Sequence, residues 1–237
     1  MPSRYSVKTY LSNGYYHIYN RGVEKRTIFV DQQDYRVFLD YLKTYLLPKD
    51  EDALEEILAD KEKSWAEKDK ALKLLRLNNF YNKIDLLSFC LMPNHFHFLV
   101  KQDEHNTIDM FMNSLSTRYV MYFNRKHKRV GPLFQDVYKA VLVESDEQLL
   151  YLTAYIHRNP FSRYQLLQGD VLQNALQKEE GQPSSLSHYL GLQKLEWVRE
   201  KEILAHFSTK HRTLSYEAFV RQTDDFSPVG QLLFEDE

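Results

Sequence analysis

His95 and His97 are separated by a single phenylalanine in the segment MPNHFHFLV (92–100). Alternate residues of a β-strand face the same side, so a strand here would project both imidazoles from one face, with their Cα atoms ~7 Å apart. Two imidazoles at this spacing can bind one divalent cation. A polar strand face with two surface histidines is the simpler interpretation, and the pair by itself does not decide between the two.

Tyr155 and Asn159 form a second pair, four residues apart in SDEQLLYLTAYIHRN (145–159). A helix would place both on one face, at the edge of its apolar stripe, where a tyrosine ring can pack while its hydroxyl points outward. The chain has 17 tyrosines, so a purely structural role for Tyr155 is the alternative. Asn159 precedes Pro160 and could simply end the helix.

A basic stretch with interleaved aromatic residues lies between the two pairs, and residues 118–129 contain no acidic side chain. Most such runs are solvated helix faces. Basic side chains beside aromatic rings also suit a phosphate backbone with unstacked bases. The basic residues that we expect to contact nucleic acid are Arg21 and Lys25 near the first predicted strand, Arg118, Arg125, Lys126, Lys128 and Arg129 in this stretch, and Arg158 beside the Tyr–Asn pair.

Together these features supply what a metal-assisted phosphodiester transesterification needs. Two imidazoles and a side-chain amide oxygen can hold Mg²⁺ or Mn²⁺, and the ion would act as a Lewis acid on a phosphate oxygen. A tyrosine hydroxyl would attack the phosphorus and split strand cleavage into two steps through a covalent phosphotyrosine. Such an intermediate conserves bond energy, so a 3′-hydroxyl could later rejoin the strand.

Three segments in this order resemble one known family. MPNHFHFLV, FNRKHKRVGPLFQ and YIHRNP, with YHIYNRG near the start, are similar to the HUH single-tyrosine transposases, in particular the REP-associated tyrosine transposases and the 200-type insertion-sequence transposases. The resemblance covers roughly residues 13–48 and 81–165.

The resemblance implies a role for each residue of the two pairs. His95, His97 and Asn159 match the positions of the metal ligands, and Tyr155 matches the nucleophile. It also implies the HUH endonuclease fold, which is ferredoxin-like, a substrate of single-stranded DNA next to hairpins, and a 5′-phosphotyrosine intermediate.

The elements that must position these residues follow from periodicity and from turn signals. We predict an α+β domain with the split βαβ pattern of ferredoxin-like folds and an antiparallel sheet. Ser145 and Gln148 should form a capping box at the start of the last catalytic helix. The predicted strands are 15–21, 84–91, the run HFHFLV and 137–144, and the predicted helices are 31–46, 106–129 and 145–159.

Charge divides the 237-residue chain into parts. We assign residues 1–165 to the catalytic domain, with a charged, helical and solvated insertion at about 49–80, and residues 166–237 to a mostly helical extension. That extension should begin with a polar loop and contain helices near 194–207 and 213–222. Residues 1–48 and 81–162 carry a net charge of +4 and the remainder −6, so the overall −2 hides a mildly basic body.

Cysteine content and hydropathy indicate the compartment. Cys90 is the single cysteine, which excludes an intrachain disulfide and favours a reducing environment. No run approaches the roughly 18–20 apolar residues of a membrane span. We therefore expect a cytoplasmic protein without a membrane partner. DNA binding would make it nucleoid-associated, and a homodimer is one assembly that the sequence allows.

Two other functions fit the same residues. One is a domesticated, non-catalytic regulator that binds DNA or RNA hairpins on the same fold. The other is a metal phosphodiesterase that activates water, in which Tyr155 is only structural. The first predicts binding without cleavage, and the second predicts hydrolysis without a covalent adduct.

Overall fold

A four-stranded antiparallel sheet forms the centre of the computed structural model, which describes residues 10–161 and 182–233. The spatial order is β2-β3-β1-β4, and all three pairings are antiparallel. This is the strand order of ferredoxin-like domains, so the predicted α+β class is confirmed. The strands are β1 (Tyr15–Arg21), β2 (Ile84–Met92), β3 (His95–Gln102) and β4 (Lys139–Val143).

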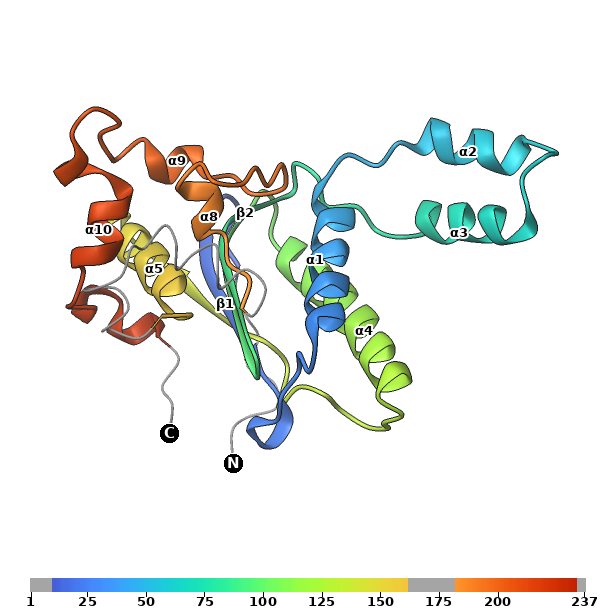
Figure 1. The fold of residues 1–237 in the computed structure, drawn as a ribbon, viewed down its shortest axis with the longest axis horizontal. Coiled ribbons are helices and arrows are strands. Elements are labelled where there is room, and N and C mark those ends of the chain that lie inside the picture. The colour runs from blue at the N-terminus through green and yellow to red at the C-terminus, as the bar shows by residue number, and fades with distance from the viewer. Residues whose placement is uncertain (1–9, 162–181, 234–237) are drawn as a thin grey trace.

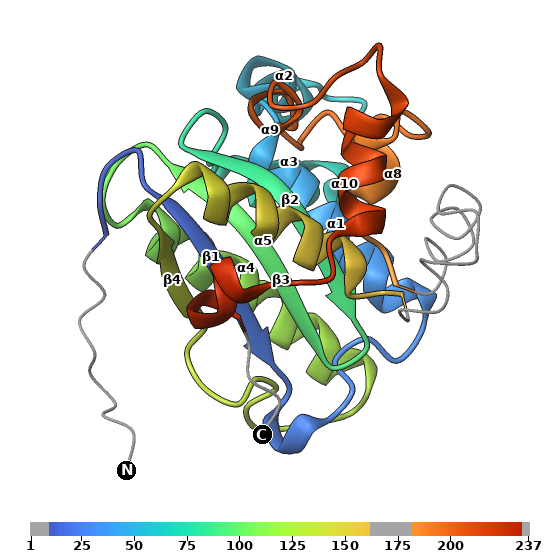
Figure 2. The ribbon, with the colours of Figure 1, turned by 90° about the vertical axis from the view of Figure 1, so that its left-hand side faces the viewer.

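The two faces of the sheet are covered by different helices (Figures 1 and 2). Helices α1 (Gln32–Leu46) and α4 (Thr107–Lys126) lie on one face, and α5 (Asp146–Arg158) lies on the other. Phe96 points toward the first face, where its ring centroid lies 5.7 Å from that of Phe38 on α1. Because side chains alternate along a strand, His95 and His97 face α5 instead.

The turn between β2 and β3 is held by the loop that follows β1. Pro93 and Asn94 form this turn, and their carbonyl oxygens accept hydrogen bonds from the amides of Ile28 and Gly22 at 2.8 Å each. A side chain at Gly22 would place its Cβ 2.2 Å from the carbonyl oxygen of Arg26, so only glycine fits. The start of β3, and with it His95, is thereby anchored.

Helix α5 begins close to the predicted residue, but its capping box is only half formed. The Ser145 hydroxyl accepts a hydrogen bond from the Gln148 amide at 3.2 Å. The Gln148 side chain accepts from the amide of Glu144 at 2.8 Å, not from that of Ser145. The helix ends at Arg158, with Asn159 as its C-terminal cap residue.

The charged insertion is a helical hairpin that projects away from the sheet (Figure 1). It consists of α2 (Glu51–Ala59) and α3 (Trp65–Leu75), and Ser64 and Glu67 form a complete capping box at the start of α3. Trp65 is 81% exposed, as expected for a solvated excursion. The insertion predicted at about 49–80 is confirmed as helical.

The C-terminal extension packs on the α5 side of the sheet and along the free edge of β2. The helix predicted over 194–207 is wrong for most of its length: residues 196–197 form a turn, and Val198 forms an isolated bridge with Leu86 of β2. The Arg199 amide donates to the Leu86 carbonyl at 2.9 Å, and such pairing covers an edge strand. The predicted polar loop lies largely outside the described residues.

The remaining elements are α8 (Leu186–Tyr189), α9 (Lys201–Leu204), α10 (Tyr216–Gln222) and the 3₁₀ turns η1 (Val23–Lys25), η2 (Arg212–Leu214) and η3 (Ser227–Leu232).

The described part of the extension shares one hydrophobic core with the sheet. The Trp197 ring stacks on Phe89 of β2 with centroids 5.1 Å apart, and Leu186 and Val229 are fully buried. None of the described helices has the length and apolarity needed to cross a membrane.

His157 joins α5 to this extension and should make the stability of the fold depend on pH. It is fully buried, with Nδ1 2.6 Å from the Tyr216 hydroxyl and Nε2 2.7 Å from Ser185 Oγ. Burial lowers its pKa to about 3, whereas an unfolded histidine titrates near 6.5. The unfolded chain therefore binds more protons between these values, so stability should fall as pH is lowered from about 6.5 toward 3.

We expect His157→Gln to flatten this dependence by up to about 1.4 kcal/mol per pH unit, the contribution of one proton. Urea unfolding at several pH values between 7 and 4.5 measures the slope. His105→Gln, at an exposed position, is the matched control and should leave the slope unchanged. An unaltered slope in His157→Gln would contradict the assignment.

Candidate active site

The two histidines of β3 lie beneath α5, next to Tyr155. The ring centroids of His95 and His97 are 5.0 Å apart at an interplanar angle of 89°. The ring of Tyr155 lies 5.6 Å from that of His97, nearly perpendicular to it. His97 is 0% exposed, so it is not a surface histidine. The structure thus brings both predicted pairs to one place.

Asn159 lies between Tyr155 and His95. Its Nδ2 donates to the Tyr155 carbonyl at 3.0 Å, across one turn of helix. Its side-chain hydrogen bonding also affects the pKa values of both the Tyr155 phenol and the His95 imidazole. Phe226 packs on the tyrosine ring from the extension, with centroids 5.8 Å apart.

The ionisation of these side chains is set mainly by burial. Burial lowers the pKa of His95 to about 4, aided by the charge of Arg21 and opposed by Asn159. Burial and the neighbouring His17, His95 and Arg21 hold the pKa of His97 well below its usual value. Burial raises the pKa of Tyr155, while Asn159 and Arg21 act in the opposite direction. At neutral pH the site therefore contains two neutral imidazoles and a protonated phenol.

This donor set fits a hard or borderline divalent cation. Neutral imidazoles are the form that binds metal, and an asparagine amide can supply an oxygen. Within residues 10–161 and 182–233, no three histidine, cysteine or carboxylate side chains gather into a metal site. Beside the two histidines, the side-chain amide of Asn159 is the candidate for a third ligand, since it hydrogen-bonds to His95.

Arg21 belongs to this site rather than to a remote basic patch. It lies opposite His95 in the β1–β3 register, and it is 6% exposed. Its charge acts on the pKa values of His95, His97 and Tyr155. A cavity of about 320 Å³ lies beside it and includes Lys139 in its lining.

His17 is a site residue that the sequence analysis did not single out. It is fully buried on β1, and its Nε2 lies 2.9 Å from Nδ1 of His97. Its Nδ1 lies 2.5 Å from the carbonyl oxygen of Leu232 in the extension. Alternation in YYHIYNR places His17 on the same face as Arg21, but only the pairing of β1 with β3 brings it to His97.

Residues 10–159 match the family model described as transposase IS200 like. The chain belongs to the IS200-like transposase family. The matched segment contains the whole sheet and α5, and it confirms the resemblance drawn from the three motifs. One similar solved structure is described as a REP-associated tyrosine transposase bound to a REP hairpin, with a TM-score of 0.38 and 11% identity, covering 66% of this chain and 72% of that one. No curated protein matches the chain.

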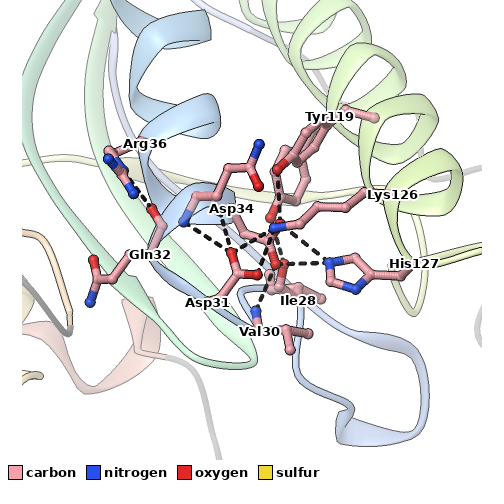
Figure 3. A network of polar contacts seen from close by, with 11 residues as sticks. Ile28, Val30, Asp31, Gln32, Asp34, Arg36, Tyr119, Lys126 and His127 are labelled. Atoms are coloured by element: carbon pink, nitrogen blue, oxygen red, sulfur yellow. Dashed lines mark hydrogen bonds and ion pairs between the residues drawn. The ribbon is translucent and has the colours of Figure 1, made fainter.

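The predicted basic stretch of this transposase lies mainly on the opposite face of the sheet from the histidines. Lys126, at the end of α4, donates to Asp31 at 2.6 Å and to Asp34 at 2.8 Å, and its side chain is 21% exposed (Figure 3). Two carboxylates thus neutralise one of the cations expected to contact phosphate. This contact links the N-terminus of α1 to the C-terminus of α4.

The other predicted DNA contacts of the transposase differ in what they touch. The Arg118 guanidinium lies 3.9 Å from the ring centroid of Tyr41. Arg129 donates to Asn124 at 2.8 Å and to the Pro132 carbonyl at 3.2 Å. The exposed members of the set, whose side chains face solvent, are Lys25, Arg125 and Lys128.

Arg158 points into the extension. It donates to the carbonyl oxygens of Val220 at 2.7 Å and Arg221 at 3.2 Å, and it forms an ion pair with Asp224. Its side chain is 11% exposed. In this transposase Arg158 therefore holds α10 against α5.

Proposed function

We propose that this transposase cleaves and rejoins single-stranded DNA through a covalent bond between Tyr155 and a 5′-phosphate. One observation carries the proposal: Tyr155 lies against His97, with Asn159 adjacent to both Tyr155 and His95 on the same face of the sheet. A nucleophile next to metal-ligand side chains is the arrangement that metal-assisted phosphoryl transfer requires.

His95, His97 and Asn159 would hold Mg²⁺ or Mn²⁺. When bound, the cation would polarise a non-bridging oxygen of the scissile phosphate as a Lewis acid. The neutral state of both imidazoles supports this role, since their lowered pKa values keep them available as ligands at physiological pH.

Tyr155 would supply the attacking oxygen. Its Oη forms a bond to phosphorus as the bond from phosphorus to the 3′ oxygen breaks, and the departing 3′ oxygen takes a proton from water. The phenolic proton is released to solvent. Attack by a free 3′-hydroxyl on the phosphotyrosine reverses these bond changes and rejoins the strand.

Arg21 would assist at the same phosphate. Burial raises the pKa of Tyr155, so a nearby positive charge is needed to favour the phenolate during attack. The guanidinium of Arg21 already acts in that direction, and a planar guanidinium also suits phosphate oxygens.

The proposed substrate is a single strand that carries a hairpin. Membership of the transposase family supports DNA as the partner. The exposed Lys25, Arg125 and Lys128 supply positive charge that can contact its backbone.

Covalent adduct formation tests this function. We expect the protein to form an SDS-resistant adduct with a hairpin-bearing single strand in Mn²⁺ or Mg²⁺. No adduct should form when excess chelator is present from the start, and adding the ion back should restore its formation. A label at the 3′ end should remain with the protein, while a label at the 5′ end should leave with the 3′-hydroxyl fragment. Hydrolysis without an adduct would instead indicate a water-activating phosphodiesterase, and binding without cleavage would indicate a regulator.

A further inference from the structure

Each histidine of the candidate metal site is connected to a backbone carbonyl through one intervening side chain. For His97 the intervening side chain is His17. Nδ1 of His97 lies 2.9 Å from Nε2 of His17, and Nδ1 of His17 lies 2.5 Å from the carbonyl oxygen of Leu232. The planes of the two imidazoles differ by only 17° and their centroids are 5.1 Å apart, which suits a hydrogen bond between ring nitrogens, and both rings are fully buried.

For His95 the intervening side chain is Asn94. Nδ1 of His95 lies 2.7 Å from Oδ1 of Asn94. Nδ2 of Asn94 donates to the carbonyl oxygen of Lys25 at 3.2 Å. The loop after β1 therefore orients the amide of Asn94, with its nitrogen toward Lys25 and its oxygen toward the imidazole.

The donor and the acceptor of each hydrogen bond can be assigned, because a backbone carbonyl can only accept a hydrogen bond. The Leu232 carbonyl requires a proton on Nδ1 of His17, so neutral His17 presents an acceptor at Nε2. Nδ1 of His97 must then donate, which places the lone pair of His97 on Nε2. The same reasoning at the Lys25 carbonyl makes Oδ1 of Asn94 the acceptor and places the lone pair of His95 on its Nε2.

We propose that His17 and Asn94 are positioning residues that hold His97 and His95 in the Nδ1–H tautomer and thereby direct both Nε2 atoms to a divalent cation. The inference rests on the proposed metal site and adds to it the partners that orient its ligands. Hydrogen bonds of this kind set the tautomer and ring orientation of metal-binding histidines.

The proposal also gives the C-terminal extension a part in the site. Leu232 belongs to η3, and its carbonyl oxygen is the final acceptor in the series of hydrogen bonds that starts at His97. The turn η3 lies beside α5 (Figure 2). The sheet and α5 supply the ligands, but this acceptor comes from the extension.

Long-range ¹H–¹⁵N spectra of the full-length, metal-free protein with labelled histidines report the tautomers directly. We expect His97 and His95 to carry the proton on Nδ1. A predominant Nε2–H tautomer for His97 would overturn the proposal, whether or not the protein binds metal.

Titration with Mn²⁺ alone, followed by calorimetry, measures the effect on the cation. We expect His17→Phe and Asn94→Ala each to weaken Mn²⁺ binding by roughly 10- to 100-fold. His17→Gln keeps one acceptor and one donor and should recover part of the loss. His157→Gln, which removes another fully buried histidine with two hydrogen bonds, is the matched control and should leave the Mn²⁺ affinity unchanged.

The outcomes separate this proposal from the proposed function. Wild-type affinity for Mn²⁺ in a folded His17→Phe variant would overturn the positioning role while leaving the metal site intact. If the wild-type protein does not bind Mn²⁺ although both histidines are in the Nδ1–H tautomer, the proposed metal site is wrong. The claim that these tautomers direct Nε2 to a cation is then wrong as well.

Discussion

Tyr155→Phe is expected to reduce covalent adduct formation by ~10³-fold or more, because it removes the attacking oxygen. The phenylalanine ring can keep the contacts of the tyrosine ring with His97 and Phe226, so the fold should persist. The SDS-resistant adduct measures the chemistry, and fluorescence anisotropy with the same hairpin strand measures binding. We expect the adduct to disappear while binding stays within a few-fold of wild type.

Tyr151→Phe is the matched control on the same helix. Tyr151 lies one turn earlier, and its ring packs against Phe219 with centroids 5.4 Å apart. It should form the adduct at the wild-type level. An adduct of undiminished yield in Tyr155→Phe would show that another tyrosine is the nucleophile.

Asp34→Ala is expected to lower the free energy of unfolding by about 3 kcal/mol, toward the lower end for breaking a buried ion pair. Asp34 is fully buried and accepts hydrogen bonds from Lys126 and His127, from the Tyr122 hydroxyl at 3.1 Å, and from the Val30 amide at 2.9 Å. Burial alone would raise its pKa, but these hydrogen bonds outweigh that effect and lower it. Figure 3 shows how they converge between α1 and α4.

Lys126 limits the loss of unfolding free energy in Asp34→Ala, because its ammonium group is partly exposed to water and keeps its contact with Asp31. At roughly 2–4 °C per kcal/mol for a chain of this size, the midpoint of thermal unfolding should fall by about 6–12 °C. Asp40→Ala, an exposed aspartate on the same helix, should change it little. A loss below about 1 kcal/mol in Asp34→Ala would mean that this network is not a stabilising contact.

Sequence patterns predicted the sheet and the three helices that cover it. Strand β1 and helix α1 match within one residue, since alternation, helical stripes and breakers such as Pro48 act over short stretches of chain. The prediction of a helix over 194–207 is wrong because of contacts with residues far away in the sequence. The apolar residues of this segment bury against β2, and a backbone amide there is used to pair with the sheet edge instead of a helical turn.

The basic stretch shows the same limit for individual side chains. Charge in the sequence marked Lys126 as a candidate phosphate contact, but Asp31 and Asp34, more than 90 residues earlier, neutralise it. Charge alone also predicts a DNA contact at Arg21, but only the β1–β3 register shows that Arg21 lies beside His95. A run of basic residues in the sequence does not show which side chains will pair with it in the folded protein.

The sequence by itself determined the family, the fold class and the two residue pairs, because each pair is defined by a spacing within a single strand or helix. Only the tertiary structure decided that the pairs meet, and that His17 lies behind His97 with Leu232 behind it. His17, His97 and Leu232 come from β1, β3 and the extension, 80 and 215 residues apart in their two contacts. Alternation along a strand assigns each residue to one face, but which strands pair and which segments pack on them is decided by long-range contacts.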